Sequence, residues 1–447
     1  MFELLEKYLM GPMTKLSQFK LVRAITYAGM ASISFTIVGS MFLIVSILPD
    51  VFPFLEGIWA ASFDKISNLY MVANAASIGV IAIYFLAATS YEYARILAED
   101  DEIDIKPMNG MLMAFFMLFM MMPQFIATGG GIDVVTNPDA NIYSGWELSG
   151  TNGIARLGAT GIFSAILISW IAVNIYAQCV KHNIVIKLPD VVPDGVGRSF
   201  TALVPGFLVA IAAMVIQGVL AGLGTDLYKL ISIPFGFVIN ITGSLPGVWV
   251  IYLLVGCLWM VGIHGATIIW NILTPVTVAN FAANAEGATN VLAGEFNNAF
   301  VICGGSGATL AFTFMLVFLA KSEQLKAIGK GEIVPALFNI NEPLIFGLPI
   351  VYNPALAIPF IFAPIVTSTI AYLAISMGFI PPVIANMPWP TPVGVGAFIS
   401  TGGSLMAGVV AVVCTLVAGL IWFPFFKKYD SDLYKQEQEQ LAAESEA

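Results

Sequence analysis

The sequence predicts an all-α polytopic membrane protein, with about ten transmembrane helices and re-entrant hairpins in the C-terminal half. Of its 447 residues, 58% are hydrophobic and only 10% are charged, and the mean hydropathy is +0.88. Soluble domains carry about 25% charged residues, so this composition indicates a chain folded in lipid. The net charge of −10 argues against nucleic-acid binding, which depends on basic patches. The four cysteines show no metal-ligand spacing and no paired framework.

The first half contains apolar runs close to the roughly 20 residues that a bilayer requires. They predict spanning helices at about 24–48, 69–94, 108–128, 157–180 and 200–223. Residues 1–20 show no clear cleavage site and resemble an interfacial helix. Residues 224–245 mix charged and apolar side chains, which predicts either a helix along the membrane surface or a bent crossing element. The segment 129–156 is expected to be a long loop rich in Gly and Asn.

The second half is less regular. Further spans are expected at about 246–270, 303–320, 354–378 and 404–426. Lysines place both termini and residues 321–334 in the cytoplasm, so 271–302 must also cross back, as a short crossing or a re-entrant hairpin. The halves divide the chain into a scaffold over 1–245, a site-bearing domain over 246–426 and a polar tail over 427–447.

A carboxylate lies in the most irregular apolar stretch, residues 339–360. Glu342 is followed by prolines at 343, 349, 354 and 359, which a regular helix does not hold at such density. Broken backbone at membrane depth is tolerated where it is buried in protein or lines a cavity, and a carboxylate there is a functional candidate. The other interpretation is a short cytoplasmic loop with a capping glutamate.

Two further candidate segments precede Glu342. Trp259 and His264 would lie about 140° apart on a regular helix, and the flanking Gly262 and Gly265 could bend it to bring both toward one cavity. A histidine satisfied within the core, beside an interfacial tryptophan, is an equally good interpretation.

The run Cys303–Gly307 includes Gly305 and Ser306 and offers backbone groups to a polar ligand. Its alternative is close helix packing through small residues. Trp389 lies in a second irregular stretch between the last two spans, among five prolines. Acid, imidazole, amide and indole groups together suit an uncharged polar substrate such as a sugar, because an anion would require Arg or Lys within the membrane.

The block Asn341-Glu342-Pro343, with Phe346-Gly347-Leu348-Pro349 and Asn353-Pro354, resembles the signature of the enzyme IIC subunits of the bacterial phosphoenolpyruvate-dependent sugar phosphotransferase system. The lactose/cellobiose/diacetylchitobiose family is the most similar. Two other segments are also similar to that family: Lys187–Pro193 with Arg198-Ser199-Phe200, and Gly262–Gly265.

This resemblance implies a homodimer in the bacterial cytoplasmic membrane, with a dimerising N-terminal domain and a C-terminal domain that carries the substrate across. It implies that Glu342 and His264 are the catalytic residues, holding the sugar near the hydroxyl that becomes phosphorylated. Asn341, Gly305 and Ser306 are the remaining binding candidates, and Trp259 and Trp389 are candidates for stacking on the sugar. No cofactor and no metal is expected.

Lactose transporters of this family carry a fused IIB domain with a phosphorylatable cysteine, whereas no cysteine here lies in a soluble segment. We therefore expect a separate phosphorylated IIB, supplied by IIA, and a β-linked disaccharide of the cellobiose or diacetylchitobiose type. Two other functions stay open at this point. One is an ion-coupled secondary sugar transporter with Glu342 as proton carrier, and the other is a passive channel.

Overall fold

The computed structural model describes residues 18–135, 154–186, 194–348, 350–351 and 353–446, with isolated residues within 12–16 and 142–147. The expected interfacial helix over 1–20 and the segment Lys187–Pro193 lie largely outside these residues. The described chain is mostly helical, as its composition predicts.

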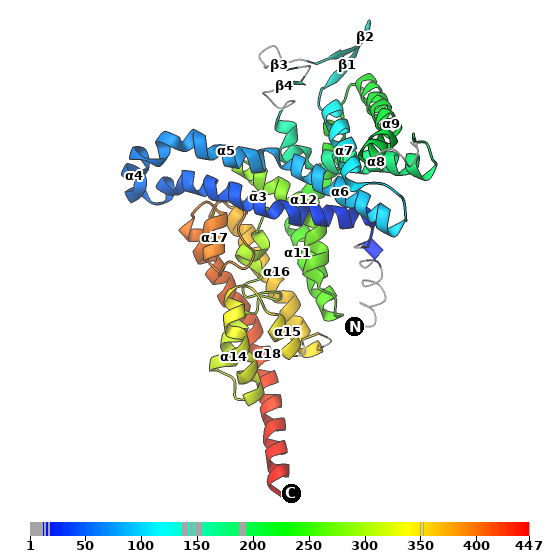
Figure 1. Cartoon of the computed structure of the whole chain (residues 1–447). Helices are drawn as coiled ribbons and strands as arrows, with labels where there is room; N and C mark the ends of the chain where they lie inside the picture. The colour runs from blue at the N-terminus through cyan, green and yellow to red at the C-terminus, as the bar shows by residue number, and fades with distance from the viewer. Residues whose placement is uncertain are drawn as a thin grey trace.

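The first half of the chain forms the upper part of Figure 1. Its α-helices are α3 (Lys20–Val51), α4 (Glu56–Ala61), α5 (Ser67–Ser77), α6 (Ile81–Asp100), α7 (Pro107–Met121), α8 (Ile162–Lys181), α9 (Asp194–Gly222) and α10 (Leu227–Thr242). Its 3-10 turns are η2 (Pro53–Leu55), η3 (Phe63–Ile66), η4 (Ile78–Val80), η5 (Ile154–Leu157) and η6 (Ala159–Gly161). The central packing is of α3 and α8 against α6.

The second half extends away from α3 and ends in a long helix that carries the C-terminus (Figure 1). Its helices are α11 (Leu245–Met260), α12 (Gly265–Ala285), the π-turn η7 (Asn297–Val301), α13 (Leu310–Phe318), α14 (Glu323–Leu337), α15 (Glu342–Gly347), α16 (Pro354–Ser376), α17 (Val395–Ser400) and α18 (Leu405–Glu446). Helices α11 and α18 pack on α16, and α12 packs against α3.

Among the described residues, six helical runs are long and apolar enough to cross a membrane. They are Lys20–Pro49, Phe63–Asp100, Ala159–Lys181, Phe200–Gly222, Pro354–Ser376 and Leu405–Ala442. Helices α10 and α11 meet at a 75° bend and would together count as a seventh. This bend follows residues 224–245, where the sequence predicted a surface helix or a bent crossing element. The remaining crossings of the expected ten stay a prediction.

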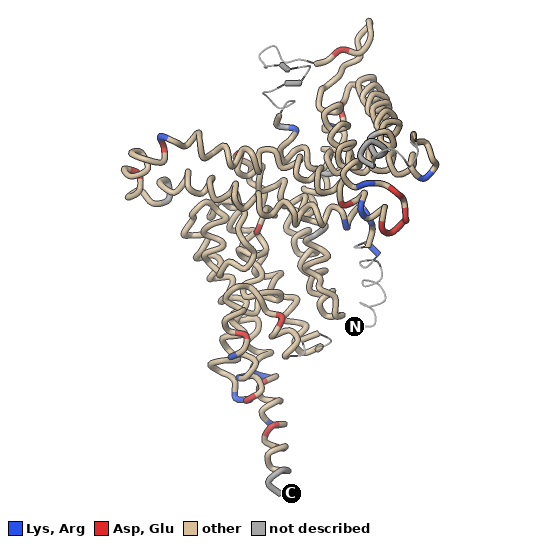
Figure 2. Tube along the Cα trace, in the orientation of Figure 1, with Lys and Arg blue, Asp and Glu red and all other residues tan. Residues whose placement is uncertain are grey.

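Charge is unevenly distributed along the trace. Figure 2 shows most Lys, Arg, Asp and Glu near the tips of the molecule, around the loop after α6 and around the lower parts of α14 and α18. The helices between these regions are almost free of charge. This pattern fits a charge-poor belt held in hydrocarbon, where ionised side chains are expensive.

Several expected spans end early, and each has a local cause. Helix α7 stops at Met121, two residues before Pro123, which cannot donate a helical hydrogen bond. The run expected over 246–270 divides between α11 and α12 at Gly262, whose φ of +79° is left-handed. The span expected over 303–320 contains only the nine-residue α13, because a series of turns precedes it.

The proline-rich stretch is less broken than the sequence suggests. Helix α16 begins at Pro354, with Asn353 as its N-cap, and continues unbroken through Pro359 and Pro364. Each interior proline removes one backbone donor, but the packing of α11 and α18 along α16 holds the helix together. Among the described residues of this stretch, the helical structure is interrupted before α15 and again between α15 and α16.

Two short antiparallel hairpins occur around the long loop expected over 129–156, and the first of them begins within the span expected over 108–128. Strand β1 (Phe125–Thr128) pairs with β2 (Gly131–Val134), and β3 (Ile142–Tyr143) pairs with β4 (Trp146–Glu147). After them, Arg156 Nη2 donates to Asp226 Oδ2 at 3.0 Å and Nη1 donates to the Met122 carbonyl oxygen at 2.7 Å. Arg156 and Asp226 are both buried, so this ion pair fixes the hairpin region to the start of α10.

One face of α3 is turned toward the second half of the chain. Ser32, Thr36 and Ser40 recur on it at helical spacing and are buried. The Asn386 backbone N–H donates to Ser40 Oγ at 2.7 Å, and Asn386 Nδ2 donates to Thr36 Oγ1 at 3.0 Å. Asn386 lies in the proline-rich loop before α17, so these bonds cross between the two halves.

Helix α18 supports α13 and α14. Asp430 Oδ1 accepts from the backbone N–H groups of Lys321 and Ser322 at 2.8 and 3.0 Å. Glu437 accepts from the Ser322 hydroxyl and from the two following backbone N–H groups. These contacts satisfy donors that the first turn of a helix leaves free. The Phe312 ring of α13 stacks on Trp422 at 4.3 Å between centroids, with the Phe426 ring at 6.3 Å.

Candidate functional site

Trp259 and His264 lie together at the break between α11 and α12. Their ring centroids are 4.4 Å apart, with the ring planes inclined by 47°. The chain reverses through Gly262, and a side chain at that φ would be strained. A bend at the glycines therefore brings the two rings together, as the sequence suggested, although it takes the form of a complete break in the helix.

His264 is the N-cap of α12. Its Nδ1 accepts from the Thr267 backbone N–H at 3.1 Å, and the Thr267 hydroxyl lies 2.8 Å from the same nitrogen. A nitrogen that accepts a backbone N–H carries no proton, so a neutral His264 has its proton on Nε2. The exposed ring can therefore offer Nε2–H as a hydrogen-bond donor. Thr267 fixes this tautomer and was not singled out from the sequence.

The Gly-rich turn packs directly against the segment that carries Glu342. Gly305 has a φ of +100°, and a Cβ there would collide with the Asn341 side chain. Asn341 Nδ2 donates to the Ser306 carbonyl oxygen at 2.6 Å and to Thr309 Oγ1 at 2.8 Å. Close packing through small residues is thus the observed arrangement of this turn. Sugar binding by Gly305, Ser306 and Asn341 remains a prediction.

A third irregular stretch joins the same cluster through Asn339. Its Oδ1 accepts from the Gly304 backbone N–H at 2.9 Å, and its Nδ2 donates to the Thr391 carbonyl oxygen at 3.0 Å. Trp389 is two residues from Thr391 and is 51% exposed. From the sequence, Asn339 was only the start of the irregular stretch, although its left-handed φ of +60° marks it as a special position.

Aromatic contacts connect the histidine end of the site to the Gly-rich turn. Trp259 is 3% exposed and meets the edge of the Phe360 ring at 6.4 Å between centroids. Phe360 in turn fills the space beside Gly307. The Gly307 carbonyl oxygen accepts from Trp422 Nε1 at 2.9 Å. Because Trp259 is largely covered, Trp389 has the greater ring area available for stacking.

Glu342 is the first residue of α15 and is exposed, with Pro343 at the next position. The sequence led us to expect a carboxylate enclosed in apolar surroundings. The exposed position results from the short turn of α15, whose buried side is formed by Leu344 and Ile345. Among the described contacts, no hydrogen bond or ion pair joins Glu342 to His264.

A cavity of about 400 Å³ lies between α3, α6 and α12. Its lining includes Arg23, Tyr27, Glu92 and Thr267. This size falls within the range of small-molecule sites. The sequence assigned the first half mainly to the scaffold, so these residues were missed. Arg23 and Glu92 lie at the ends of expected spans, where charged residues serve to assign membrane topology and do not by themselves mark a binding site.

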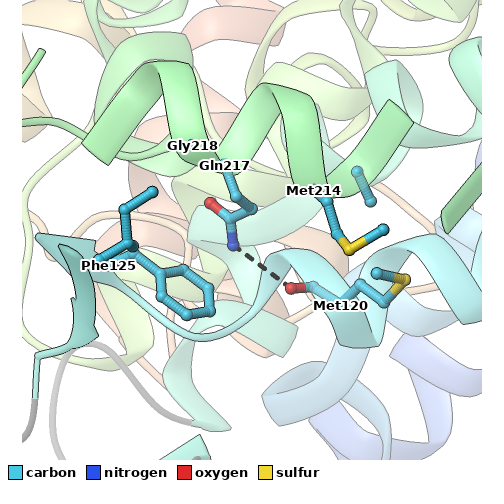
Figure 3. A pocket seen from close by; sticks show the side chains of 7 residues that line it. Met120, Phe125, Met214, Gln217 and Gly218 are labelled. Atoms are coloured by element: carbon cyan, nitrogen blue, oxygen red, sulfur yellow. Dashed lines mark hydrogen bonds between the residues drawn. The ribbon is translucent and has the colours of Figure 1, made fainter. Parts of the chain in front are cut away.

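Figure 3 shows a second cavity, of about 160 Å³, at the base of the β1–β2 hairpin. Gln217 crosses it and donates from Nε2 to the Met120 carbonyl oxygen at 3.3 Å. Met214 and Phe125 form much of its wall. It contains none of the candidate residues and has an almost wholly apolar lining, so it does not suit a sugar. Within the described chain, no group of three His, Cys, Asp or Glu side chains is placed to hold a metal ion.

Comparison with known proteins identifies the family of this chain. The family model described as "Phosphotransferase system, EIIC" matches residues 28–364. The cellobiose-specific EIIC component of Geobacillus stearothermophilus is 32% identical, over 97% of this chain and 95% of the relative. The oligo-beta-mannoside-specific EIIC component of Bacillus subtilis (strain 168) is 29% identical, over 100% and 98%.

The lactose-specific EIICB component of Lacticaseibacillus casei is 30% identical, over 94% of this chain but only 69% of the relative. Among solved structures, the chain is similar to the transporter ChbC, the IIC component from the N,N'-diacetylchitobiose-specific phosphotransferase system. The TM-score is 0.84 at 27% identity, covering 97% of this chain and 99% of that chain. The protein therefore belongs to the EIIC family of the phosphotransferase system.

Proposed function

We propose that this protein is the permease subunit of a sugar phosphotransferase complex. It binds a β-linked disaccharide of the cellobiose or diacetylchitobiose type, moves it inward by an elevator-like motion and presents it to a separate phosphorylated IIB. Family membership supports the general activity. Relatives specific for cellobiose and the fold of a diacetylchitobiose transporter support the substrate class.

The observation that carries the proposal is the joining of three broken segments by two asparagines. Asn339 and Asn341 hold the Gly-rich turn, the start of α15 and the loop of Trp389 in one cluster. Glu342 and Trp389 are both exposed at this cluster. An acid beside an open aromatic ring suits a sugar, whose hydroxyls bind the polar group while an apolar face covers the ring.

The tautomer of His264 makes this residue a hydrogen-bond donor and leaves the role of proton acceptor to Glu342. With Nδ1 occupied by the Thr267 N–H, His264 donates from Nε2 to a sugar oxygen. Glu342 accepts the proton of the hydroxyl that attacks the phosphoryl group, and the cysteine thiolate of IIB leaves as the phosphorus–sulfur bond breaks. This hydroxyl is the 6-hydroxyl of the nonreducing sugar. Glu342 then returns the proton to water, which its exposure allows.

The proposed motion carries residues 246–426 against the scaffold formed by residues 1–245. The hydrogen bonds from Asn386 to Thr36 and Ser40 cross that boundary, and they would have to break and re-form during the motion. We also propose ten crossings in total, with re-entrant hairpins between α12 and α13 and near α15. Both termini are placed in the cytoplasm, and the protein is a homodimer that pairs through the N-terminal domain.

Reconstituted protein tests the proposal. Proteoliposomes supplied with phosphorylated IIB and cellobiose or diacetylchitobiose should accumulate the sugar phosphate inside. Glu342→Gln keeps the shape of the side chain but cannot take a proton, so phosphorylation should fall by about 10²-fold or more. His264→Gln should have a similar effect, and the double variant should be little worse, because both residues act on one hydroxyl.

Thermal melts of each variant control for unfolding. Near-normal phosphorylation by Glu342→Gln, or a loss that unfolding accounts for, would remove Glu342 from the chemistry. The competing function is an ion-coupled secondary transporter in which Glu342 carries the proton. Accumulation of unmodified sugar, driven by a pH gradient without phosphorylated IIB, would establish that function in place of ours.

A further inference from the structure

Glu332 is a second acidic residue close to Glu342, and neither the sequence analysis nor the proposed chemistry uses it. It lies in α14, and its side chain is 0% exposed. Neither carboxylate oxygen makes a hydrogen bond of normal geometry with the described residues. A buried carboxyl group without a partner is unusual, because an unpaired charge is costly to bury and such a group takes up a proton instead.

The surroundings of Glu332 contain one other group that affects its charge. Helix α13 packs along α14 and has no titratable side chain. Helix α15, which packs on the other end of α14, contributes the carboxylate of Glu342 and the backbone N–H of Leu344. The remaining charged side chains of α14 point elsewhere on the helix and have no resolved effect on Glu332: Glu323, Lys326 and Lys330.

These neighbours affect the proton on Glu332 in opposite directions. Burial is the largest influence and raises the pKa of Glu332; the Leu344 N–H lowers this pKa and the charge of Glu342 raises it, which together give a pKa of about 7. A group with this pKa is protonated below neutral pH and becomes charged as the pH rises above it. The buried Glu332 therefore holds a charge less readily than a carboxyl group in water does.

We propose that Glu332 is a positioning residue for Glu342, and that the two carboxyl groups form a coupled pair holding one proton and one negative charge at slightly acidic pH. The buried member keeps the proton, so the charge stays on Glu342, where the sugar hydroxyl binds. Pairs of acids in unlike surroundings commonly divide their roles in this way. The catalytic meaning of the pair rests on the proposed function, but its titration does not.

Infrared difference spectra of the purified protein test the pair without any assay of activity. Raising the pH from about 6 to about 8 should weaken the carbonyl band of protonated carboxyl groups. In Glu332→Gln this change should be smaller than in the wild type, by the part that Glu332 contributes. Glu323→Gln is the matched control on the same helix, where the side chain is exposed, and it should retain the change.

The decisive variant is Glu342→Gln. Removing the charge of Glu342 should move the midpoint of the band to lower pH by about one unit, the scale on which neighbouring carboxylates influence each other. An unchanged midpoint in Glu342→Gln, or an unchanged band in Glu332→Gln, would overturn the pair.

Kinetics then connect the pair to the reaction. Above the midpoint, the second negative charge repels the anionic phosphoryl group, so sugar phosphorylation by the wild type should decline there. Glu332→Gln should retain its rate at pH 6 within about threefold, the level of a substitution that preserves shape and packing, and should lack the decline.

A decline that persists in Glu332→Gln would overturn the positioning role. An absence of phosphorylation by the wild type at every pH would instead count against the proposed function, and the infrared titration would still decide whether the pair exists.

Discussion

The substitution Asn341→Asp should destabilise the site far more than its small size suggests. Asn341 is 3% exposed, and its Nδ2 donates to the Ser306 carbonyl oxygen and to Thr309 Oγ1. Aspartate has the same shape, but its oxygens are acceptors unless one is protonated. Two hydrogen bonds worth about 0.5–1.5 kcal/mol each are lost, and the buried Ser306 carbonyl oxygen is left facing another acceptor, for a total of about 2–4 kcal/mol.

A matched control lies twelve positions along the chain. Asn353 is the N-cap of α16, and its Oδ1 accepts from the N–H groups of Ala355 and Leu356. Aspartate caps helices as well as asparagine does, so Asn353→Asp should melt within a degree or so of the wild type.

The assay is thermal unfolding in detergent, followed by intrinsic fluorescence, beside titration with disaccharide. Asn341→Asp should melt several degrees lower and bind sugar weakly, because the Gly-rich turn is released from α15. A melting temperature equal to that of Asn353→Asp would refute the claim that Asn341 holds the turn.

Two further predictions concern the aromatic rings and the boundary between the halves. Trp389→Ala should weaken binding of cellobiose or diacetylchitobiose by about 1–3 kcal/mol, the scale of burying an aromatic face, with the fold intact. Trp259→Ala should weaken binding too and also lower the melting temperature, since Trp259 is packed inside; calorimetric affinities that do not change would return either residue to a structural role. Thr36→Val removes the acceptor for Asn386 Nδ2 and should alter transport more than sugar binding. Equal transport rates in Thr36→Val and the wild type would show that this bond does not limit the motion.

The sequence predicted the class of the fold because each membrane-spanning helix appears directly as a long run of apolar residues. Long apolar runs such as residues 24–48 and 404–426 became α3 and α18, although α18 continues as a helix through the polar tail to Glu446. It failed where glycine or tertiary packing decides the backbone. Residues 303–320 were apolar enough for a span, yet the turns around Gly305 leave room only for α13. The density of prolines over 339–360 suggested broken backbone, although α16 is continuous from Pro354 through Pro359 and Pro364, as the span expected over 354–378 requires.

The candidate site was predicted as a set of segments and not as a set of contacts. Motif and polarity pointed to His264 and Glu342, but they did not indicate that the Asn341 side-chain amide donates its hydrogen bonds to the Gly-rich turn and to Thr309. The burial of Glu332 was equally hidden. It sits in a stretch with three lysines that reads as a solvated cytoplasmic helix, and only the packing of α13 and α15 shows that this side chain points inward.

Helix α18 has a mechanical consequence. Its 42 residues extend over about 63 Å, roughly twice the hydrocarbon thickness of a bilayer. Pro424 lies inside α18 and removes one backbone hydrogen bond there. The Phe312 ring contacts both Trp422, before the proline, and Phe426, after it, and these contacts stabilise the helix across the proline.

Beyond the proline, Asp430 fastens the rod to the start of α14, and before it Trp422 is bonded to Gly307. A tilt of about 5° at one end would displace the other by about 5 Å on a helix of this length. A tilt of the C-terminal end of α18 should therefore displace the Gly-rich turn, because the helix between them does not bend.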